Sequence, residues 1–392
     1  MPQLASPSYA AGGLSLYSGC KARPSWWPAV VGQWVSIAGS ALAGSPGVAT
    51  PPISPPGGNG PQSRINSWNS LNMKRAGSEV HLACTGGHTD YPGNECSSIA
   101  LDADAPAWRL RRTYTPYAQV QGCLSGTTGP FYNLDGTPIS RHTFFASQYI
   151  DATDRVMLFG GGGLWQNGLG SQKTDGWNAA TNTYDPAGTY PDAPTPASGG
   201  NTGQACVKHP ITEDVYTIPN GGYKVDRWNR LTNTWTRLSG TSAVAHPSFQ
   251  SGAIDPIRNQ LFCFTTPASP AGVFQAGVWD LNTGARTAIT FNASAAATAL
   301  MGVSAYYGAL VYSRTLGVYL FYNGQAGLEG VVYQITPNSG TAWDVSVFPT
   351  SGVTPATVPA TGVNQRFIEA PELQGVFLLA NYAANFNFFR TT

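Results

Sequence analysis

The sequence predicts an all-β fold, a six-bladed β-propeller made of four-stranded antiparallel blades, with the ring closed by an N-terminal strand. Three observations support this prediction. A strand–turn–strand pattern recurs along the chain, 46 glycines and 30 prolines suit tight turns, and the last repeat lacks a fourth strand. No stretch shows a competing helical periodicity.

Composition narrows the possible partners. The chain has 392 residues, a formal charge of +1 and only 10% charged residues. No basic stripe is present to neutralise phosphates, and no apolar run is long enough to cross a bilayer. The 11 Trp and 18 Tyr residues argue against a disordered chain. We therefore expect a folded protein with no nucleic-acid partner and no membrane insertion.

Residues 1–31 lie outside every repeat and are predicted to form an extended arm. The first 20 residues have no Lys or Arg and no continuous apolar core, so they do not resemble a signal peptide. The arm carries Tyr17, Trp26 and Trp27, and such apolar side chains need burial. We expect this arm to dock on another protein.

The clearest repeat is a strand, a polar turn and a strand. Residues 228–238 (WNRLTNTWTRL) and 177–186 (WNAATNTYDP) share an aromatic residue, five residues, Thr, and then Trp or Tyr. Weaker copies occupy residues 99–110, 279–289 and 333–345. These copies predict the last two strands, c and d, of five repeats.

A second strand–turn–strand unit supplies strands a and b of each repeat. It occupies residues 149–161, 207–222, 253–264, 311–324 and 368–381. Its second strand is apolar on both faces, which is typical of a strand buried between neighbouring sheets. The two units together predict a four-stranded repeat, the building block of a propeller.

The two ends of the chain are predicted to share one blade. The chain ends with three strands, in residues 365–370, 375–381 and 385–390, and no fourth strand follows. Residues 32–39 (GQWVSIAG) are similar to the d strand in residues 233–240 (NTWTRLSG). We therefore assign residues 32–40 as the closing strand, 45–61 as an extended proline-rich connector and 62–392 as blades.

Residues 62–392 resemble kelch-type propellers, the class that includes the central domain of galactose oxidase. The resemblance rests on Gly-Gly pairs after strand b (86–87, 160–161 and 221–222) and on the aromatic pairs Trp177/Tyr184 and Trp228/Trp235. More narrowly, GGHTDYPGNE (86–95), SRHTFF (140–145) and the W-x-R-L strand resemble kelch-like proteins of bacteria and tailed phages. This resemblance implies a propeller and, through the phage proteins, a virion.

The loops between strands b and c are predicted to form the recognition face. They are long and contain aromatic residues, whereas the a–b turns on the opposite face are short and plain. Residues that open strand a should lie near the central channel on the same face. The candidate ligand-binding residues are His88, Asp90, Tyr91, Arg141, His142, Trp165, Gln166, His246, Phe274 and Arg366.

Several of these residues have more than one interpretation. His88 is either a metal ligand or acid–base group, or a hydrogen-bonded loop histidine, which we favour because no second His has ligand spacing. Asp90 and Glu95 are either paired carboxylates or, as we favour, a turn-capping Asp90 and a Glu95 that is solvated or bound to backbone. Trp165 either stacks on a sugar or plugs the top of the propeller. We expect residues 86–95 to be a structural hairpin without catalytic residues.

The six cysteines have no zinc-binding spacing, and no metal or cofactor is expected. We expect reduced, buried thiols, and a disulfide between Cys84 and Cys96 remains an alternative. No residues match the copper ligands of galactose oxidase.

The favoured function is a non-catalytic binding or structural propeller on a phage virion, as part of a tail or head fibre or a decoration. Such a propeller would engage a host-surface glycan, or another virion protein through residues 1–31. The alternatives are a carbohydrate-active or galactose-oxidase-like enzyme on the b–c face and an intracellular kelch adaptor. The expected location is the virion if a phage encodes the chain, and otherwise the cytoplasm.

Overall fold

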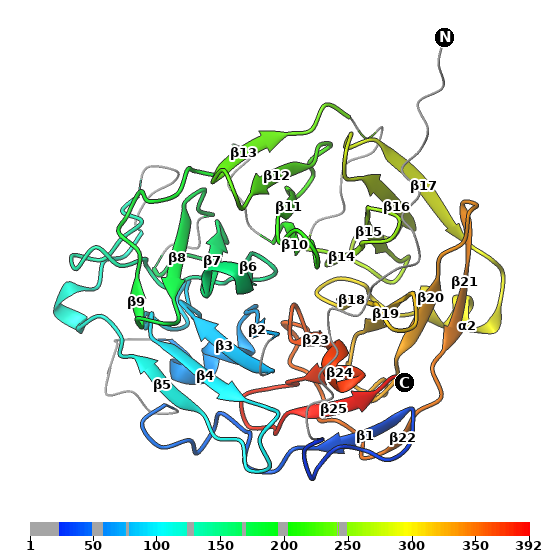
Figure 1. Ribbon diagram of the computed structural model, residues 1–392, viewed down its shortest axis with the longest axis horizontal. Helices are drawn as coiled ribbons and strands as arrows, with labels where there is room; N and C mark the ends of the chain where they lie inside the picture. The colour runs from blue at the N-terminus through cyan, green and yellow to red at the C-terminus, as the bar shows by residue number, and fades with distance from the viewer. Residues whose placement is uncertain are drawn as a thin grey trace.

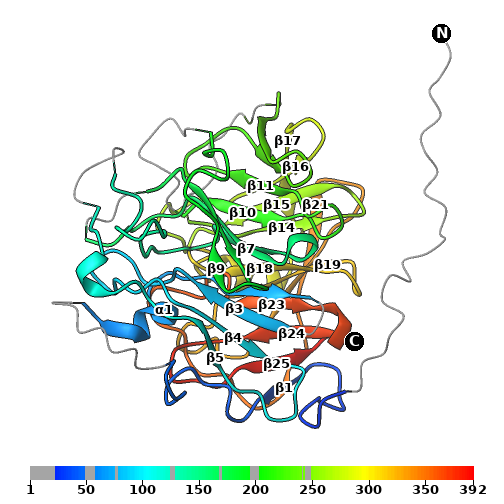
Figure 2. The same cartoon turned by 60° about the vertical axis from the view of Figure 1, so that its left-hand side comes forward.

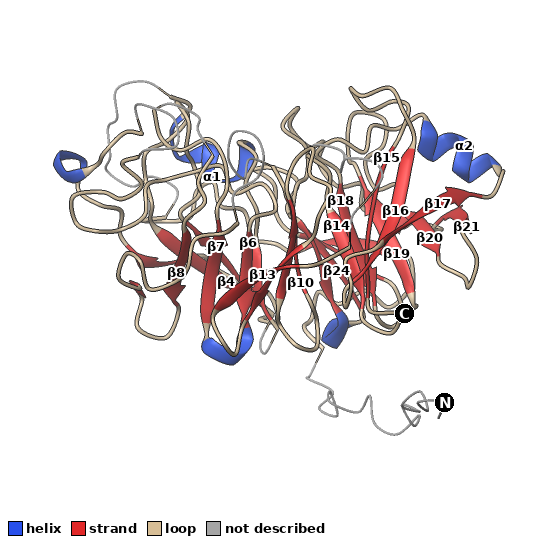
Figure 3. Cartoon of the chain, turned by 90° about the horizontal axis from the view of Figure 1, so that it is seen from above, coloured by secondary structure: helices blue, strands red, loops and turns tan. Residues whose placement is uncertain are grey.

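The computed structural model describes residues 23–48, 58–75, 78–123, 129–166, 170–194, 203–240, 242 and 249–392. These residues form a β-propeller-like all-β fold in which sheets surround a common centre (Figure 1). The first strand of each antiparallel set lies innermost, and neighbouring inner strands contact one another around the centre. Seen from the edge, long loops and both α-helices gather on one face (Figure 3).

Three sheets contain four consecutive antiparallel strands. The first is β2 (Asn72–Lys74), β3 (Glu79–Ala83), β4 (Cys96–Ala100) and β5 (Arg109–Arg112). The second is β6 (Ser147–Ile150), β7 (Arg155–Phe159), β8 (Thr174–Asn178) and β9 (Thr183–Tyr184). The third is β10 (Ala205–Lys208), β11 (Val215–Ile218), β12 (Asp226–Asn229) and β13 (Thr234–Arg237).

An eight-stranded sheet follows. It contains β14 (Gly252–Asp255), β15 (Gln260–Thr265), β16 (Gln275–Asp280), β17 (Arg286–Phe291), β18 (Ala309–Ser313), β19 (Val318–Tyr322), β20 (Tyr333–Thr336) and β21 (Ala342–Val347). Its two antiparallel halves meet where β17 runs parallel to β21, with Phe291 opposite Trp343. The buried second strands β15 and β19 carry runs of apolar residues, as expected for strands packed on both faces.

The last sheet joins the two ends of the described chain. It contains β1 (Gln33–Ser36), β22 (Ser351–Gly352), β23 (Phe367–Ala370), β24 (Gly375–Leu378) and β25 (Asn387–Arg390). β1 lies antiparallel to β25, with Trp34 opposite Phe389, which is the position that the sequence comparison gives it (Figure 2). The Trp34 side chain is buried and donates a hydrogen bond to the Gly330 carbonyl at 3.1 Å, so β1 is packed as well as paired.

Two helices depart from the expectation of an all-strand chain. α1 (Ser63–Asn66) is a single turn that follows the short turn Gly60–Gln62, while α2 (Ala295–Met301) connects β17 to β18. The Ser294 hydroxyl caps α2 by accepting from the Ala297 amide at 3.0 Å, and the alanine-rich segment has high helix propensity. The segment is too short to give a clear helical period. No helix among the described residues is long and apolar enough to cross a membrane.

The thiols of the described cysteines are buried and unbridged. In the β3–β4 register, Cys96 lies opposite Ala83, one residue before Cys84, so the two thiols do not face each other. Cys84 contacts the Ile139 carbonyl at 3.2 Å, and Cys96 contacts the Tyr184 hydroxyl at 3.4 Å. Burial raises the pKa of Cys84 to about 11 and that of Cys96 to about 12, which keeps both as thiols.

The described part of the N-terminal arm packs on its own sheet. The Trp26 ring lies 5.3 Å from the Phe388 ring, and its indole donates to the Ala103 carbonyl at 3.0 Å. The Trp27 indole donates to the Leu373 carbonyl at 2.9 Å. Trp26 and Trp27 are thus partly buried against their own chain, while contact of the arm with another protein stays a prediction. Residues 1–22 and most of the connector lie outside the described residues.

Candidate functional site

The loop of residues 86–95 is hydrogen-bonded to the equivalent loop of the next sheet. The Gly87 amide donates to the Tyr91 carbonyl at 2.8 Å and to the Ser140 hydroxyl at 2.9 Å. The His88 amide donates to the Gly163 carbonyl at 2.5 Å. Gly87 has φ +80°, and a Cβ there would lie 2.2 Å from that same carbonyl. Glycine is thus required where the two loops cross.

A buried ion pair supports this loop from below. The Arg64 guanidinium lies 3.2 Å from the Glu95 carboxylate, and both side chains are fully buried. The Tyr91 hydroxyl donates to Glu95 at 2.9 Å, and burial raises the pKa of Tyr91. Asn94 donates to Thr137 at 2.8 Å. Glu95 and Tyr91 thus have internal partners, and the expectation of a solvated or backbone-bound Glu95 is wrong, because Arg64 and Tyr91 bind its carboxylate in the interior.

Asp90 does not pair with Glu95; its carboxylate contacts His142. The His142 imidazole lies 2.8 Å from the Asp90 carboxylate, and Asn59 donates to the other oxygen at 2.6 Å. Burial alone would raise the pKa of Asp90, but these hydrogen bonds together hold it below its ordinary value. Burial lowers the pKa of His142 more than Asp90 raises it, so the imidazole is neutral near pH 7.

His88 is exposed, and its ring centroid lies 5.9 Å from that of His142. Within the described ranges, no group of three or more His, Cys, Asp or Glu side chains is arranged to hold a metal ion. The two carboxylates of this loop belong to separate pairs, Asp90 with His142 and Glu95 with Arg64.

Three other predicted residues are buried. Arg141 pairs with Asp175 at 3.1 Å and donates to the Gly160 carbonyl at 3.0 Å. Arg366 donates to backbone carbonyls, including Val363 at 3.0 Å, and burial lowers its pKa to about 9. Trp165 is 4% exposed and packs in an apolar cluster, which corresponds to the plug interpretation. The structure thus gives these side chains roles inside the fold.

The remaining predicted residues are dispersed. Phe274 is partly buried, with its ring 5.0 Å from that of Phe291. Gln166 is exposed, and its backbone amide donates to the His88 carbonyl at 2.6 Å. His246 lies outside the described residues.

A ring of left-handed residues, which sequence reasoning missed, lies just before the innermost strands. Their φ angles range from 47° to 63°. The six residues are Trp68, Phe144, Gly203, Phe249, Tyr307 and Asn364. Bulky side chains rarely adopt this conformation, which costs on the order of 1 kcal/mol each, and residues held this way cluster at functional sites.

Aromatic side chains at these positions pack together across the centre. We call Trp68, Phe144, Phe249, Tyr306 and Tyr307 the aromatic mouth. Ring centroids lie 5.4 Å apart for Phe144–Phe249 and for Phe249–Tyr307, and 6.1 Å apart for Trp68–Tyr307. Phe144 is buried, whereas the other four remain partly exposed. The His142 ring lies 5.0 Å from Trp68, so the Asp90–His142 pair borders the mouth.

A signal for this ring is present in the sequence. Residues 144–147 (FFAS), 249–252 (FQSG), 203–206 (GQAC), 307–310 (YGAL), 68–71 (WNSL) and 364–367 (NQRF) occupy equivalent positions before or within the first strands. A left-handed residue opens each tetrapeptide, and a small residue usually stands third. The variation at the first position, from Trp to Gly, hides the repeat.

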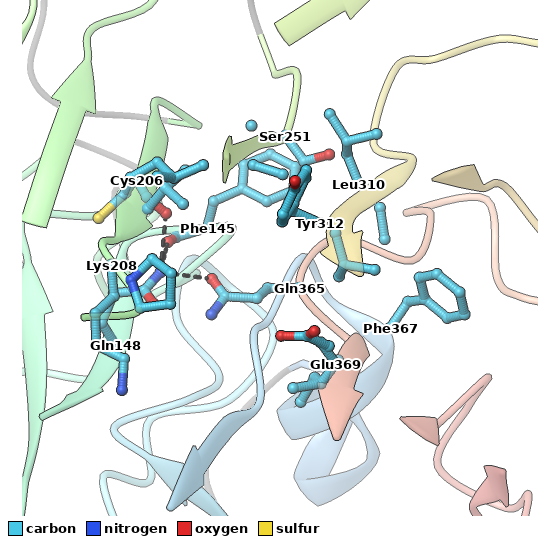
Figure 4. Close-up of a pocket in the computed structure, with 18 of the residues that line it drawn as sticks. Phe145, Gln148, Cys206, Lys208, Ser251, Leu310, Tyr312, Gln365, Phe367 and Glu369 are labelled. Carbon is cyan, nitrogen blue, oxygen red and sulfur yellow. Dashed lines mark hydrogen bonds between the residues drawn. The ribbon is translucent and has the colours of Figure 1, made fainter. Parts of the chain in front are cut away.

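Below the mouth, the inner strands enclose a cavity of about 130 Å³ (Figure 4). Its apolar wall includes Phe145, Leu310 and Phe367, while Gln148 and Gln365 are joined at 3.1 Å. A second cavity of about 120 Å³ shares several lining residues and lies toward the a–b turns.

We call this far side the charged end. It consists of Arg75, Lys208 and Arg314 with Asp151, Glu213 and Glu369. The expectation that these short turns are plain is wrong, because they bring these charged side chains together.

Comparison with known proteins finds similarity to solved structures but none at the level of sequence. No protein-family model and no curated protein match the sequence. Among solved structures, the chain is similar to one described as "Structure of YjhT", with 11% identity and a TM-score of 0.46. The match covers 82% of this chain and 93% of that one.

Proposed function

We propose that the chain is a six-bladed propeller of the kelch type that binds a glycan without catalysing a reaction. The eight-stranded sheet divides naturally into two blades, because only a short parallel pairing joins its halves. β1 supplies the fourth strand beside β25. These three blades and the three four-stranded sheets make six, and one left-handed residue precedes each.

The kelch assignment is supported by the glycine pairs after the second strands. Gly86, Gly87, Gly160 and Gly161 all have positive φ. In the kelch pattern such pairs follow strand b, and here they allow the loops of two neighbouring blades to cross at hydrogen-bonding distance.

The aromatic mouth is the observation that carries the proposed binding function. Partly exposed rings of Trp68, Tyr306 and Tyr307 present flat apolar faces, and the exposed side chains of His88 and Gln166 lie on the bordering loops. Sugar rings have apolar faces that stack on aromatic side chains, and hydroxyl groups that bond to neutral polar groups. The near-neutral composition of the chain suits such a ligand better than a highly charged one.

Binding without catalysis is favoured by the partners of the acidic groups. Asp90 is bound to His142, and Glu95 is bound to Arg64, so neither carboxylate of the loop is free to act as an acid or base. Glycosidases instead place two carboxyl groups on either side of the scissile bond.

We further propose that the protein is part of a phage virion surface. Low charge and the resemblance to proteins of tailed phages support this placement. The proposed contact with another virion protein involves residues 1–31, of which Trp26 and Trp27 are partly buried on their own sheet while Val30 and Val31 are exposed. Immunogold labelling of particles tests this placement, and unlabelled intact particles would contradict it.

Glycan binding is tested by measuring retention of the protein on immobilised bacterial surface polysaccharides. Trp68→Leu keeps an apolar side chain but removes the stacking surface, and we expect at least a tenfold loss of affinity. Tyr223→Leu is the matched control, because Tyr223 is 50% exposed and lies in another b–c loop outside the mouth. Equal losses for the two variants, or reducing sugars released by the parent protein, would overturn the proposal.

A further inference from the structure

Among the described residues, the charged end has one cation that forms no ion pair with a carboxylate. Two of its three cations are matched. Lys208 lies 2.8 Å from Asp151 and 3.6 Å from Glu213. Arg314 lies 3.1 Å from Glu369, whose other oxygen accepts from the Arg314 amide at 2.8 Å.

Arg75 has a different environment. Its guanidinium donates to the Pro210 carbonyl at 2.7 Å, and its backbone amide donates to Asp151 at 2.8 Å. In the part of the chain that the structure describes, no carboxylate forms an ion pair with this guanidinium. A guanidinium has five donor hydrogens in a planar fork, so most of its hydrogen-bonding capacity remains available.

The position of Arg75 directs this capacity toward the cavity. Arg75 lines both of the cavities described above, together with Lys208 and Glu369. Farther inside, the wall becomes apolar at Phe145, Leu310 and Phe367, and Figure 4 shows these side chains around the same space. A ligand there would meet a cation at one end and hydrocarbon at the other.

Glu372 is a second acid near this charge. It lies in the turn Pro371–Leu373 and is attracted by both Arg314 and Arg75, but it forms no ion pair with either among the described residues. Burial raises the pKa of Glu372, against the attraction of Arg314 and Arg75. Asp151 is also attracted by Arg75, but its carboxylate already pairs with Lys208 at 2.8 Å, so the Arg75 guanidinium has no ion-pair partner of its own among the described residues.

We propose that the charged end binds a small carboxylate with an apolar body, with the carboxylate on Arg75 and the apolar part toward Phe145 and Leu310. Guanidinium and carboxylate groups form paired, charge-assisted hydrogen bonds, which favours this anion. The cavity of about 130 Å³ admits a ligand of several heavy atoms and excludes a polysaccharide. This site is separate from the aromatic mouth and does not depend on the proposed glycan function.

Isothermal titration calorimetry of the full chain tests the proposal, with benzoate, acetate, inorganic phosphate and benzylamine as probes. We expect benzoate to bind more tightly than acetate, because it also fills the apolar wall, and we expect no binding of benzylamine. Saturable binding of phosphate in preference to benzoate, or no saturable binding of benzoate, would overturn the proposal.

Variants assign the binding to Arg75. Arg75→Gln should weaken benzoate binding at least tenfold, and Arg75→Lys should retain part of the affinity. Arg230→Gln is the matched control, since Arg230 lies 3.6 Å from Glu213 in the same charge network but does not line the cavity. Circular dichroism checks that each variant is folded. A folded Arg75→Gln variant that binds benzoate as the parent does would refute the assignment.

Discussion

The aromatic mouth and the charged end are built from the two ends of the same inner strands, yet they use opposite chemistry. Along β6 the chain passes from Phe144 at the mouth to Asp151 at the charged end. Along β18 it passes from Tyr307 at the mouth to Arg314 at the charged end. Each passage covers seven residues, or roughly 20 Å of extended chain. Thus a single β-strand can present two unrelated surfaces.

The difference lies in how each end satisfies its groups. At the mouth, the aromatic rings bury one another's apolar surface, but this packing holds their residues in the unfavourable left-handed backbone conformation. At the charged end, side chains of neighbouring sheets satisfy one another through ion pairs such as Lys208–Asp151, and one guanidinium is left over. Apolar packing leaves flat faces that can accept a neutral ligand, while the unmatched cation can accept an anion. The experiments below test this contrast, from the largest expected effect to the smallest.

The largest effect is expected from the ion pair beneath the mouth. Arg64→Met would leave the Glu95 carboxylate buried without a counter-charge, because both side chains are fully buried. We expect the free energy of unfolding, measured by chemical denaturation, to fall by about 3–5 kcal/mol. Arg64→Met combined with Glu95→Leu should recover part of this loss, since no isolated charge remains.

The matched control is an exposed pair of the same kind. Lys173 lies 2.7 Å from Asp192, with both side chains substantially exposed to water. Lys173→Met should change the free energy of unfolding by about 0–1 kcal/mol. Similar losses for Arg64→Met and Lys173→Met would show that the mouth loops do not depend on the buried pair.

The strands were predictable from the sequence, whereas most of the two sites was not. Alternating and apolar runs identify strands such as β11 and β15 because burial on a sheet imposes a local pattern. The pairing of β1 with β25 was accessible because residues 32–39 have the pattern of other fourth strands. The mouth was missed because bulky residues such as Trp68 disfavour the left-handed conformation that they adopt.

Long-range charge pairing explains the other omissions. Arg141 and Arg366 open their strands as expected, but the sequence gives no sign that Asp175 and backbone carbonyls would enclose them. Lys208 and Asp151 belong to different sheets, so nothing local indicates that they meet. Such contacts depend on how the sheets are arranged around the centre, and a single sequence does not encode that arrangement locally.

An intermediate effect is expected at the rim of the mouth, where acid should loosen the Asp90–His142 pair. Burial lowers the pKa of His142 in the folded chain below the ordinary value that it has in the unfolded chain. At a pH between these two pKa values, the imidazole is protonated in the unfolded chain and neutral in the folded chain. The free energy of unfolding should therefore fall as the pH drops below about 6.5, by on the order of 1 kcal/mol. The lowered pKa of Asp90 acts in the same direction at more acidic pH.

His142→Gln should flatten this dependence in denaturation curves recorded from pH 7 to pH 5. Gln166→Ala is the control, because the Gln166 side chain is exposed on the bordering loop and has no titratable group, so the slope should be unchanged. An unaltered slope in His142→Gln would mean that another group causes the acid sensitivity, and the contrast with the charged end would lose its pH component.

The smallest effect on the free energy of unfolding is expected at the charged end, where Glu369 has an ion-pair partner and Glu372 has none among the described residues. Burial raises the pKa of Glu372 above its ordinary value, so the folded state is penalised once the pH exceeds that ordinary value and the carboxyl of the unfolded chain ionises freely. The Gln side chain in Glu372→Gln cannot ionise, so this variant should raise the free energy of unfolding at pH 7 by less than about 1 kcal/mol, a gain that vanishes below about pH 4. Glu369→Gln provides the opposite case, since it removes the partner of Arg314 and should destabilise the fold. Thermal unfolding of both variants at pH 4 and pH 7 measures the two signs. If Glu372→Gln lowers stability at pH 7, then Glu372 is a matched anion, and the charge of Arg75 would no longer be the one left over.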